Sequence, residues 1–301
     1  MEKPTSTRKS VDDSDDLAAI RKSIMEFNQR KLELEVQKNW DRFYKRNKTA
    51  FFKDRHWTKR EFVQICPDIS WEVMHRYLLV CVLMLSIFRF IDMFTSLAIL
   101  ECGCGVGNLI FPMLDYFPKI FVYACDFSSN AIEYVKNNGS FDPKRCATFV
   151  CDLVESDLLR YLEKDSIDIV TMVYMLSAVN PKKMISVLKN IAKVIKPGGS
   201  VIFRDYAIGD YAMHRFGSDR KLSDQFYVRQ DGTYAYYFSE GIIYKRADCI
   251  CLCLLLENLV ELFRQCCFEA KSCYYVRRET VNRKINLVVP RTFIQGRFIK
   301  S

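Results

Sequence analysis

The stretch from Leu97 to Asn108, LAILECGCGVGN, constrains the fold of this chain more than any other. It begins as a short apolar run and continues with glycine at every second position, Gly103, Gly105 and Gly107. Glycine adopts left-handed backbone conformations and has no Cβ to keep a ligand away, so this run predicts a tight turn out of a strand. A helix expected from Asn108 to about Tyr116 would point free backbone N–H groups over the turn. The segment therefore predicts a loop that cradles a nucleotide-like ligand.

The spacing of this loop distinguishes two classes of ligand. The dinucleotide fingerprint, G-x-G-x-x-G, places a pyrophosphate on the helix N-terminus. Here the pattern is E-x-G-x-G-x-G, with Glu101 just before the glycines. A carboxylate would repel a pyrophosphate, but it would attract a cofactor whose tail carries an ammonium and a sulfonium. The pattern favours S-adenosylmethionine over a nicotinamide dinucleotide, and it resembles the S-adenosylmethionine loop of class I methyltransferases.

Strand and helix patterns alternate regularly after the glycine loop. Such alternation predicts an α/β, Rossmann-like domain over residues 97–301, with a mostly parallel seven-stranded sheet and helices on both faces. A turn at Lys196–Gly199 separates a helix from the next strand. The expected strands are Ile120–Asp126, Ala147–Asp152, Ile167–Tyr174, Ser200–Asp205, Glu269–Arg277 and Asn286–Ile299, and the expected helices are Asn130–Asn137, Ser156–Leu162, Lys182–Ile195 and 249–264.

Acidic residues follow two consecutive strands. Asp126 ends the strand after the glycine loop, where a carboxylate accepts hydrogen bonds from ribose hydroxyls. Asp152 ends the next strand, where it could accept from an adenine amino group. Either residue alone could be a helix cap or an exposed strand-end carboxylate, but their joint placement favours a ligand site. The loop Ser177–Val179 holds no histidine or lysine, which counts against hydride transfer.

The N-terminal part of the chain differs in composition from this domain. Residues 1–16 are polar and acidic and are expected to be disordered, and residues 17–70 are expected to form a helical extension. A helical pattern runs from Leu17 to about Phe43, with two apolar stripes. Between Gln37 and Phe62 aromatic and basic residues alternate. That interleaving suits stacking on bases and gripping phosphates, although a packing cap over the core explains the aromatic residues equally well.

The charge of +9 is concentrated at two ends of the chain. Residues 21–60 carry thirteen basic and five acidic side chains, and residues 271–301 carry eight basic and one acidic. Two basic ends around a near-neutral middle suggest a polyanionic partner such as nucleic acid. Solvated surface segments are an equally good explanation on charge alone.

The thirteen cysteines do not form the pattern of a disulfide scaffold or a zinc site. Cys102, Cys104, Cys125 and Cys151 fall at predicted strand ends, where a free thiol packs as a small hydrophobe. No C-x-x-C occurs and the chain has three histidines, so no metal site is expected. These features favour a reducing, cytoplasmic location, with the nucleus as a second compartment. No secretory or mitochondrial leader pattern is present in this sequence.

One apolar stretch, Tyr77 to Leu100, is interrupted only by Arg89 and Asp92. Its uninterrupted part is too short to span a bilayer, and charges within a span cost about 2.5–3.5 kcal/mol each. A buried helix is expected, with a membrane-associated segment as the alternative, and we expect no stable membrane association.

Nine motifs together resemble a known family: QKNWDRFYKRN, FFKDRHW, ECGCGVGN, YACDFS, LSAV, KPGG, FRDY, FYVRQDGT and RRETVN. They are similar to the eukaryotic tRNA N3-cytosine methyltransferases, most of all the member that acts on serine tRNAs. The resemblance covers Lys31–Ser70, Leu97–Ser239 and Phe263–Ile299. It implies methylation of a cytidine at position 32 in the anticodon loop, by a monomer that works with seryl-tRNA synthetase.

The resemblance also implies roles for individual residues. Substrate positioning falls to Arg204, Asp205, Tyr206, Arg229 and Asp231, with Phe226 as a further candidate that could equally be core. The cofactor contacts are Trp40, Tyr44, Glu101, Gly103, Gly105, Gly107, Asp126 and Asp152, with Val173 near the adenine. The RNA contacts are Lys45, Arg46, Lys48, Lys53, Arg55 and Arg278.

The expected chemistry makes little demand on acid or base groups. Neutral cytosine N3 has a free lone pair, so attack on a sulfonium methyl needs positioning more than proton removal. N3 lies on the Watson–Crick edge, so the base must be unpaired. The D/N-P-P-Y/F signature of exocyclic amino methylation is absent.

Two departures from the family pattern leave alternatives open. Residues 71–96 and 241–257 are extra apolar material, and Asn180 stands where a histidine is expected before Pro181. Because the first insert precedes the strand of the glycine loop, a catalytically impaired tRNA- or synthetase-binding protein is one rival. A nicotinamide-dependent oxidoreductase is the other.

Overall fold

The computed structural model describes residues 13–50, 55, 64, 97–240, 259–282 and 286–301. The apolar stretches 71–96 and 241–257 and the predicted RNA contact Lys53 lie outside these residues.

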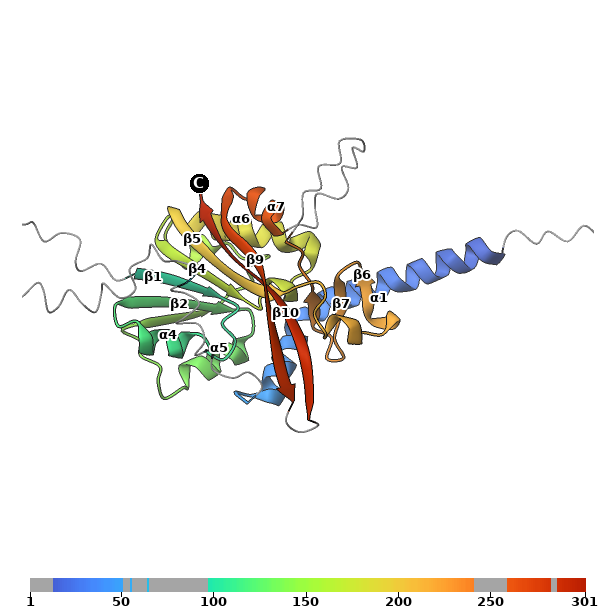
Figure 1. Ribbon diagram of the computed structural model, residues 1–301, viewed down its shortest axis with the longest axis horizontal. Coiled ribbons are helices and arrows are strands. Elements are labelled where there is room, and N and C mark those ends of the chain that lie inside the picture. The colour runs from blue at the N-terminus through green and yellow to red at the C-terminus, as the bar shows by residue number, and fades with distance from the viewer. Residues whose placement is uncertain (1–12, 51–54, 56–63, 65–96, 241–258, 283–285) are drawn as a thin grey trace, which may run out of the picture.

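A seven-stranded sheet forms the centre of the molecule (Figure 1). Its order is β3-β2-β1-β4-β5-β10-β9; the first five strands are parallel, and β10 runs antiparallel to both of its neighbours. The predicted fold class is confirmed. The strands are β1 Leu97–Cys102, β2 Ile120–Asp126, β3 Cys146–Val150, β4 Ile167–Val173, β5 Ile195–Tyr206, β9 Phe268–Asn282 and β10 Leu287–Lys300.

Helices cover both faces of this sheet (Figure 1). On one face α4, Ile110–Tyr116, and α5, Ser129–Lys136, pack on the cluster that includes Ile99 and Val122. On the other face α6, Met184–Val194, and α7, Leu259–Arg264, pack on the cluster that includes Val170. The parallel strands are buried on both sides, which explains why they are apolar almost throughout.

The sequence predicted most of these elements closely, but one predicted helix was wrong. The segment Ser156–Leu162 forms only a 3-10 turn, Leu158–Arg160. The side chain of Asn190 in α6 accepts from the Leu158 N–H at 3.0 Å and donates to the carbonyl of Ser156 at 2.6 Å. Asn190 thus takes the Ser156 carbonyl, which a regular helix would have paired with the N–H four residues later, and fixes the turn to α6.

A second, three-stranded sheet was not predicted. It comprises β6 Lys221–Ser223, β7 Phe226–Val228 and β8 Tyr234–Tyr236, in antiparallel order. Strands of three residues are too short to show a period-2 pattern, so they leave little sign in the sequence. The ring of Phe226 is 6 % exposed and belongs to the main core cluster, which favours the core role over substrate contact.

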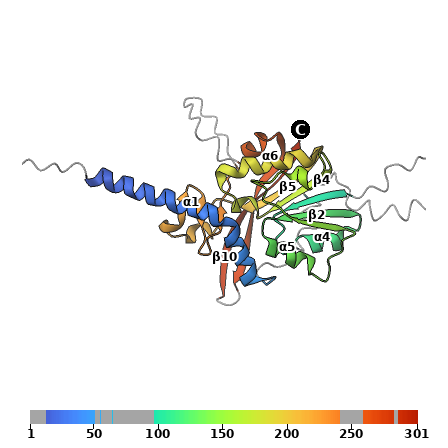
Figure 2. The same cartoon turned by 180° about the vertical axis from the view of Figure 1, so that it is seen from behind.

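The N-terminal helix α1, Asp13–Asn47, is 35 residues long and begins four residues before the predicted start. Figures 1 and 2 show that its first half projects from the body, while its second half passes the small sheet toward α5. Of the two predicted stripes, Phe27 and Leu34 are exposed, at 68 % and 81 %, whereas Phe43 is buried. Phe27 and Leu34 were predicted to lie on the first stripe, and Phe43 on the second stripe with Val36 and Trp40. Of the side chains described, those of the second stripe are buried or half-buried.

The described cysteines are free thiols, and Cys102, Cys104, Cys125 and Cys151 are all buried as predicted. In the described ranges, no group of three or more histidine, cysteine, aspartate or glutamate residues is placed to hold a metal ion. None of the helices in those ranges is long and apolar enough to cross a membrane.

Candidate active site

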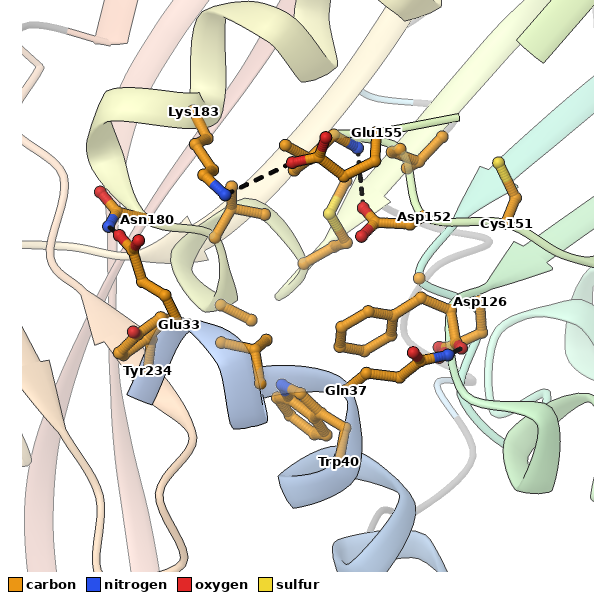
Figure 3. Close-up of a pocket in the computed structure, with 18 of the residues that line it drawn as sticks. Glu33, Gln37, Trp40, Asp126, Cys151, Asp152, Glu155, Asn180, Lys183 and Tyr234 are labelled. Atoms are coloured by element: carbon orange, nitrogen blue, oxygen red, sulfur yellow. Dashed lines mark hydrogen bonds and ion pairs between the residues drawn. The ribbon is translucent and has the colours of Figure 1, made fainter. Parts of the chain in front are cut away.

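A cavity of about 400 Å³ lies at the carboxyl ends of the parallel strands. In Figure 3 the helix α1 forms one wall of this cavity and faces Asp152 and Glu155 across it. Five of the residues predicted to contact a cofactor line the cavity together, although they come from α1, the glycine loop and two strand ends: Trp40, Tyr44, Gly103, Asp126 and Asp152.

The glycine loop needs each of its three glycines for a separate reason. All three have positive φ, at 68°, 55° and 90° for Gly103, Gly105 and Gly107. A Cβ on Gly103 would lie 2.3 Å from Cγ of Met175, and one on Gly107 would lie 2.4 Å from Cε2 of Phe111. A Cβ on Gly105 would meet the hydroxyl of Tyr44 at 3.0 Å. Larger residues would displace the wall of the cavity.

Asp126 links the glycine loop to the strand beside it. Its Oδ2 accepts from the Gly105 N–H at 3.0 Å, and its Oδ1 accepts from the Ser128 N–H at 2.9 Å. Burial raises the pKa of this carboxyl to about 6, and the two N–H groups oppose that rise. A carboxylate oxygen can accept more than one hydrogen bond, so Asp126 retains acceptor capacity toward the cavity it lines. That capacity fits a pair of ribose hydroxyls.

Asp152 stands on the opposite side of the cavity from α1 (Figure 3). Its Oδ1 accepts from the Val154 N–H at 2.9 Å, which fixes the carboxylate at the strand end. Trp40 and Tyr44, one helical turn apart on α1, face it as neighbouring rings with centroids 5.8 Å apart. An aromatic wall opposite a fixed carboxylate suits a planar ligand that carries an amino group.

Glu101 lies behind the glycine loop, not on the cavity surface, and it is 2 % exposed. Its Oε2 has no hydrogen-bond partner in the part of the chain that the structure describes. Burial raises the pKa of Glu101 to about 8, Asp126 adds to the rise, and Arg55 opposes it. A buried carboxylate with an unused oxygen fits a cationic ligand, as predicted for the ammonium and sulfonium of S-adenosylmethionine.

Hydrogen bonds fasten α1 to the loops around the cavity. Gln37 Nε2 donates to the Phe127 carbonyl at 2.7 Å, and the Ser128 hydroxyl donates to Asp41. On the other side, Asn180 donates from its amide to Glu33. Asn180 also caps the following turn by accepting from Lys182 N–H at 3.1 Å. The asparagine in place of the expected histidine is therefore used to close the cavity wall.

The small sheet also contacts α1. Asn39 Nδ2 donates to the carbonyl of Gly232 at 3.3 Å, and a Cβ on Gly232 would lie 2.5 Å from that same nitrogen. Arg46 pairs with Asp231 at 3.7 Å in the same turn. The motif FYVRQDGT thus ends in a turn that α1 packs against directly, an interaction that local sequence patterns could not reveal.

Two predicted substrate residues on β5, Arg204 and Tyr206, belong to a cluster of aromatic rings and cations beside the cavity. The ring of Tyr206 lies 5.1 Å from that of Tyr174, which lines the cavity, and 6.3 Å from that of Phe293. Arg204 is buried, donates to Oε1 of Gln295 at 3.0 Å, and lies 5.1 Å from the Phe293 ring centroid. The cluster is aromatic and cationic, as expected for nucleic-acid contact.

Three other predicted substrate residues have clear structural contacts. Asp205 is fully buried and accepts from the N–H groups of Ser177 and Tyr206, both at 2.9 Å. Asp231 accepts from the hydroxyl and N–H of Thr233. Arg229 lies over Tyr206, 5.6 Å from the ring centroid. Neither Asp205 nor Asp231 lines the cavity. Both carboxylates instead accept hydrogen bonds from nearby backbone N–H groups and so fix the loops around them.

The predicted RNA contacts fall in different environments. Lys45, Arg46 and Lys48 are exposed at the end of α1, a group termed here the basic end of α1. Arg278 is half-buried on β9. Arg55 is also half-buried, and its Nη1 donates to the carbonyl of Val173 at 3.3 Å.

Val173 itself is 4 % exposed and does not line the cavity, whereas Tyr174, the next residue, does. Tyr174 was predicted only as the last residue of a strand. Its role depends on a positive φ of 57°, which no local pattern indicated for a tyrosine.

Comparisons with known proteins identify the family and the fold. A family model described as a methyltransferase domain matches residues 99–199. The chain is 47 % identical to the human tRNA N(3)-cytidine methyltransferase METTL6 over 277 residues, which cover 92 % of this chain and 84 % of that protein. It is 38 % identical to the tRNA N(3)-methylcytidine methyltransferase trm141 of Schizosaccharomyces pombe, covering 91 % of this chain and 96 % of that one.

A solved SAM-dependent methyltransferase from Methanosarcina mazei shares the fold, with a TM-score of 0.50 at 18 % identity over 71 % of this chain and 98 % of its own. The similarity to these two relatives extends over more than nine tenths of this chain. This chain therefore belongs to the family of tRNA N(3)-cytidine methyltransferases.

Proposed function

We propose that this protein transfers the methyl group of S-adenosylmethionine to N3 of an unpaired cytidine in tRNA. The observation that carries the proposal is the cavity under α1, which brings together Trp40, Tyr44, Gly103, Asp126 and Asp152. The names of the similar proteins support tRNA as the substrate class.

Each part of the cofactor has its own candidate contacts. Asp126 accepts from the ribose hydroxyls and Asp152 from the adenine amino group, while Trp40 and Tyr44 cover the rings. Glu101, buried behind the glycine loop, ionises when the cationic tail binds and balances its charge. The end of β4 at Val173 lies near the adenine, with Tyr174 rather than Val173 on the cavity surface. The cofactor supplies an electrophilic methyl group when it is bound.

The reaction itself needs orientation. The lone pair of cytosine N3 attacks the methyl carbon as the bond from that carbon to sulfur breaks, and the positive charge moves from the sulfonium to the base. No proton has to leave N3, so no general base is required. The contribution of the protein is to hold the two reacting atoms in line, which can be worth several kcal/mol.

The substrate reaches this site across a basic surface. The basic end of α1 carries three exposed cations, and Arg278, together with Lys53, extends the set of candidates. Phosphate contacts of this kind provide affinity and register, while base contacts provide specificity. The aromatic rings around Tyr206, with Arg204 packed beside them, are the candidates for contact with an unstacked base.

We further propose that the target is position 32 of serine tRNAs, and that the protein works in the cytoplasm, and in the nucleus too, as a monomer. Serine tRNAs differ in anticodon, so an enzyme that reads the anticodon loop cannot select them by sequence alone. Their shared feature is a long variable arm, which seryl-tRNA synthetase grips. Two proteins on one RNA gain affinity even when their direct contact is small.

The test is methylation of purified serine tRNA with and without seryl-tRNA synthetase, at enzyme well below saturation. We expect a higher rate with the synthetase, and little methylation of tRNAs from other families under the same conditions. Equal rates with and without the synthetase would leave the choice of tRNA to this chain alone.

Binding of radiolabelled S-adenosylmethionine separates the proposal from its rivals. An impaired tRNA-binding protein or a nicotinamide enzyme would not retain the label, whereas the proposed enzyme does.

A further inference from the structure

The guanidinium of Arg55 occupies a defined place at the carboxyl end of β4. Its Nη1 donates to the Val173 carbonyl at 3.3 Å, and its Cζ lies 5.4 Å from the ring centroid of Tyr174. The backbone of Arg55 is tied to the helix side of the glycine loop, because its N–H donates to the carbonyl of Asn108 at 2.9 Å. A planar donor group therefore lies over an aromatic ring next to a backbone acceptor.

Tyr174 is held in a conformation that side chains rarely adopt. Its φ is 57°, and left-handed backbone at a non-glycine residue costs about 1 kcal/mol or more. The Tyr174 N–H donates to the Arg204 carbonyl at 2.8 Å, and the ring packs edge-on against Phe293 at 5.5 Å. Strain of this kind persists only where the surroundings fix it, and here it turns the residue out of the strand to line the cavity.

The Arg55 guanidinium, which donates to the Val173 carbonyl, resembles one edge of cytosine in shape. A guanidinium is a flat N–C–N unit with outward N–H donors, and cytosine presents N3, C4 and N4 as a flat N–C–N unit in which the N4 amino group carries the N–H donors. A backbone carbonyl accepts both. Uracil has a carbonyl oxygen at C4 in place of the amino group, so the same acceptor would repel it.

We propose that the carbonyl of Val173 and the ring of Tyr174 form the subsite that reads the target cytosine, and that the base displaces the Arg55 guanidinium. The base amino group donates to Val173 O, and the pyrimidine lies over Tyr174. N3 is two bonds from that amino nitrogen, so anchoring the amino group brings N3 to the strand end that borders the cavity. This inference rests on the proposed function and adds the basis for choosing cytidine over uridine.

The left-handed backbone of Tyr174 permits a clean deletion of its ring. Glycine adopts this conformation without strain, so Tyr174→Gly removes the stacking partner and leaves the backbone geometry of the loop accessible. We expect kcat/KM for tRNA to fall about ten- to a hundredfold, the range found for loss of a base-stacking ring. Because Tyr174 also lines the cofactor cavity, kcat/KM for tRNA is compared at saturating S-adenosylmethionine, so that a change in cofactor affinity does not contribute. The matched control is Cys267→Gly, an exposed residue with φ 64° away from the cavity, which should retain full activity.

The role of the Val173 carbonyl is tested by changing the target base of the tRNA. Full-length tRNAs carrying cytidine, N4,N4-dimethylcytidine or uridine at the target position are compared for binding to the wild-type protein in the presence of S-adenosylhomocysteine. The dimethyl base lacks the amino donor and uridine replaces it with an acceptor, so both should bind at least tenfold more weakly than cytidine. Binding does not require turnover, so this comparison decides the subsite even if no methylated product forms.

Two results would overturn the inference: full kcat/KM in Tyr174→Gly, or equal binding of the three bases. Failure of the proposed function has a different signature, which is a wild-type protein that forms no 3-methylcytidine on any tRNA.

Discussion

Asp126 shows how one side chain can organise both a loop and a ligand. Its two oxygens hold the backbones of Gly105 and Ser128, yet the residue still lines the cavity. An amide at this position would place N–H donors where acceptors are needed. We predict that Asp126→Asn weakens S-adenosylmethionine binding by about 1–3 kcal/mol, measured by calorimetry.

A matched control for this change is Asp157→Asn. Asp157 also follows a strand and caps a turn, accepting from the Leu159 N–H, but it does not line the cavity. Its variant should bind the cofactor like the wild type. Equal affinity in Asp126→Asn would move the ribose contact to another residue.

Glu101 makes stability depend on pH. Its pKa in the folded protein is about 8, raised mainly by burial from an ordinary value of 4.5. Between these values the folded state holds a proton that the unfolded state has lost, so the stability from this group is complete below pH 4.5 and disappears as pH rises through 8.

We predict that, without cofactor, the free energy of unfolding of the wild type falls between pH 5 and 8.5 more steeply than that of Glu101→Gln. Chemical denaturation at several pH values measures both. Asp205, with a pKa of about 6, contributes to both proteins and cancels in the comparison, whereas the interaction of Glu101 with Asp126 is part of the measured difference. Parallel pH profiles would mean that Glu101 is not the source of the dependence.

At the scale of elements, α1 is the wall that completes the cavity. Its contacts to Phe127, Ser128, Asn180 and Gly232 reach loops 87 or more residues away in sequence. Replacing both Trp40 and Tyr44 by alanine removes the rings on the cavity side of this helix. We predict at least tenfold weaker S-adenosylmethionine binding and slower methylation of tRNA.

The control for the double variant is Phe27→Ala, on the same helix but 68 % exposed and outside the cavity. It should leave cofactor affinity unchanged. Normal binding and methylation by the Trp40→Ala, Tyr44→Ala protein would show that α1 only packs against the domain.

Some elements and site residues could be predicted from the sequence, and others could not. The bounds of β2 were predicted to the residue, because an apolar run between a turn and an acidic strand end leaves little choice. The sequence also predicted that Asp126 and Asp152 belong to one ligand site, since parallel strands end at the same edge of a sheet. The roles of Gln37, Asn180 and Tyr174 could not be predicted, because they depend on contacts or a backbone angle set by distant residues. The helix expected at Ser156–Leu162 failed for the same reason.

At the level of the whole molecule, exposed basic side chains lie near both ends of the parallel strands, and we predict that those on the cavity side bind tRNA. The basic end of α1 lies on the cavity side, where α1 lines the site. Replacing Lys45, Arg46 and Lys48 by alanine should weaken tRNA binding and reduce the slope of log K against log salt, by roughly one for each phosphate that the variant no longer neutralises.

The control removes the same charge from the opposite edge. Lys119, Lys144 and Lys164 are exposed and precede the starts of β2, β3 and β4, so they lie at the amino ends of the parallel strands. Their triple alanine variant should keep the wild-type slope. An unchanged slope in the first variant would exclude the basic end of α1 as a phosphate-binding surface.

The central claim is that the cavity under α1 delivers a methyl group to cytosine N3 in tRNA. The most direct measurement is mass spectrometry of nucleosides from tRNA incubated with this protein and S-adenosylmethionine that carries a trideuterated methyl group. We expect the label to appear in 3-methylcytidine, and to be strongly reduced when Trp40 and Tyr44 are both replaced by alanine. Label in a different nucleoside, or none in tRNA at all, would contradict it.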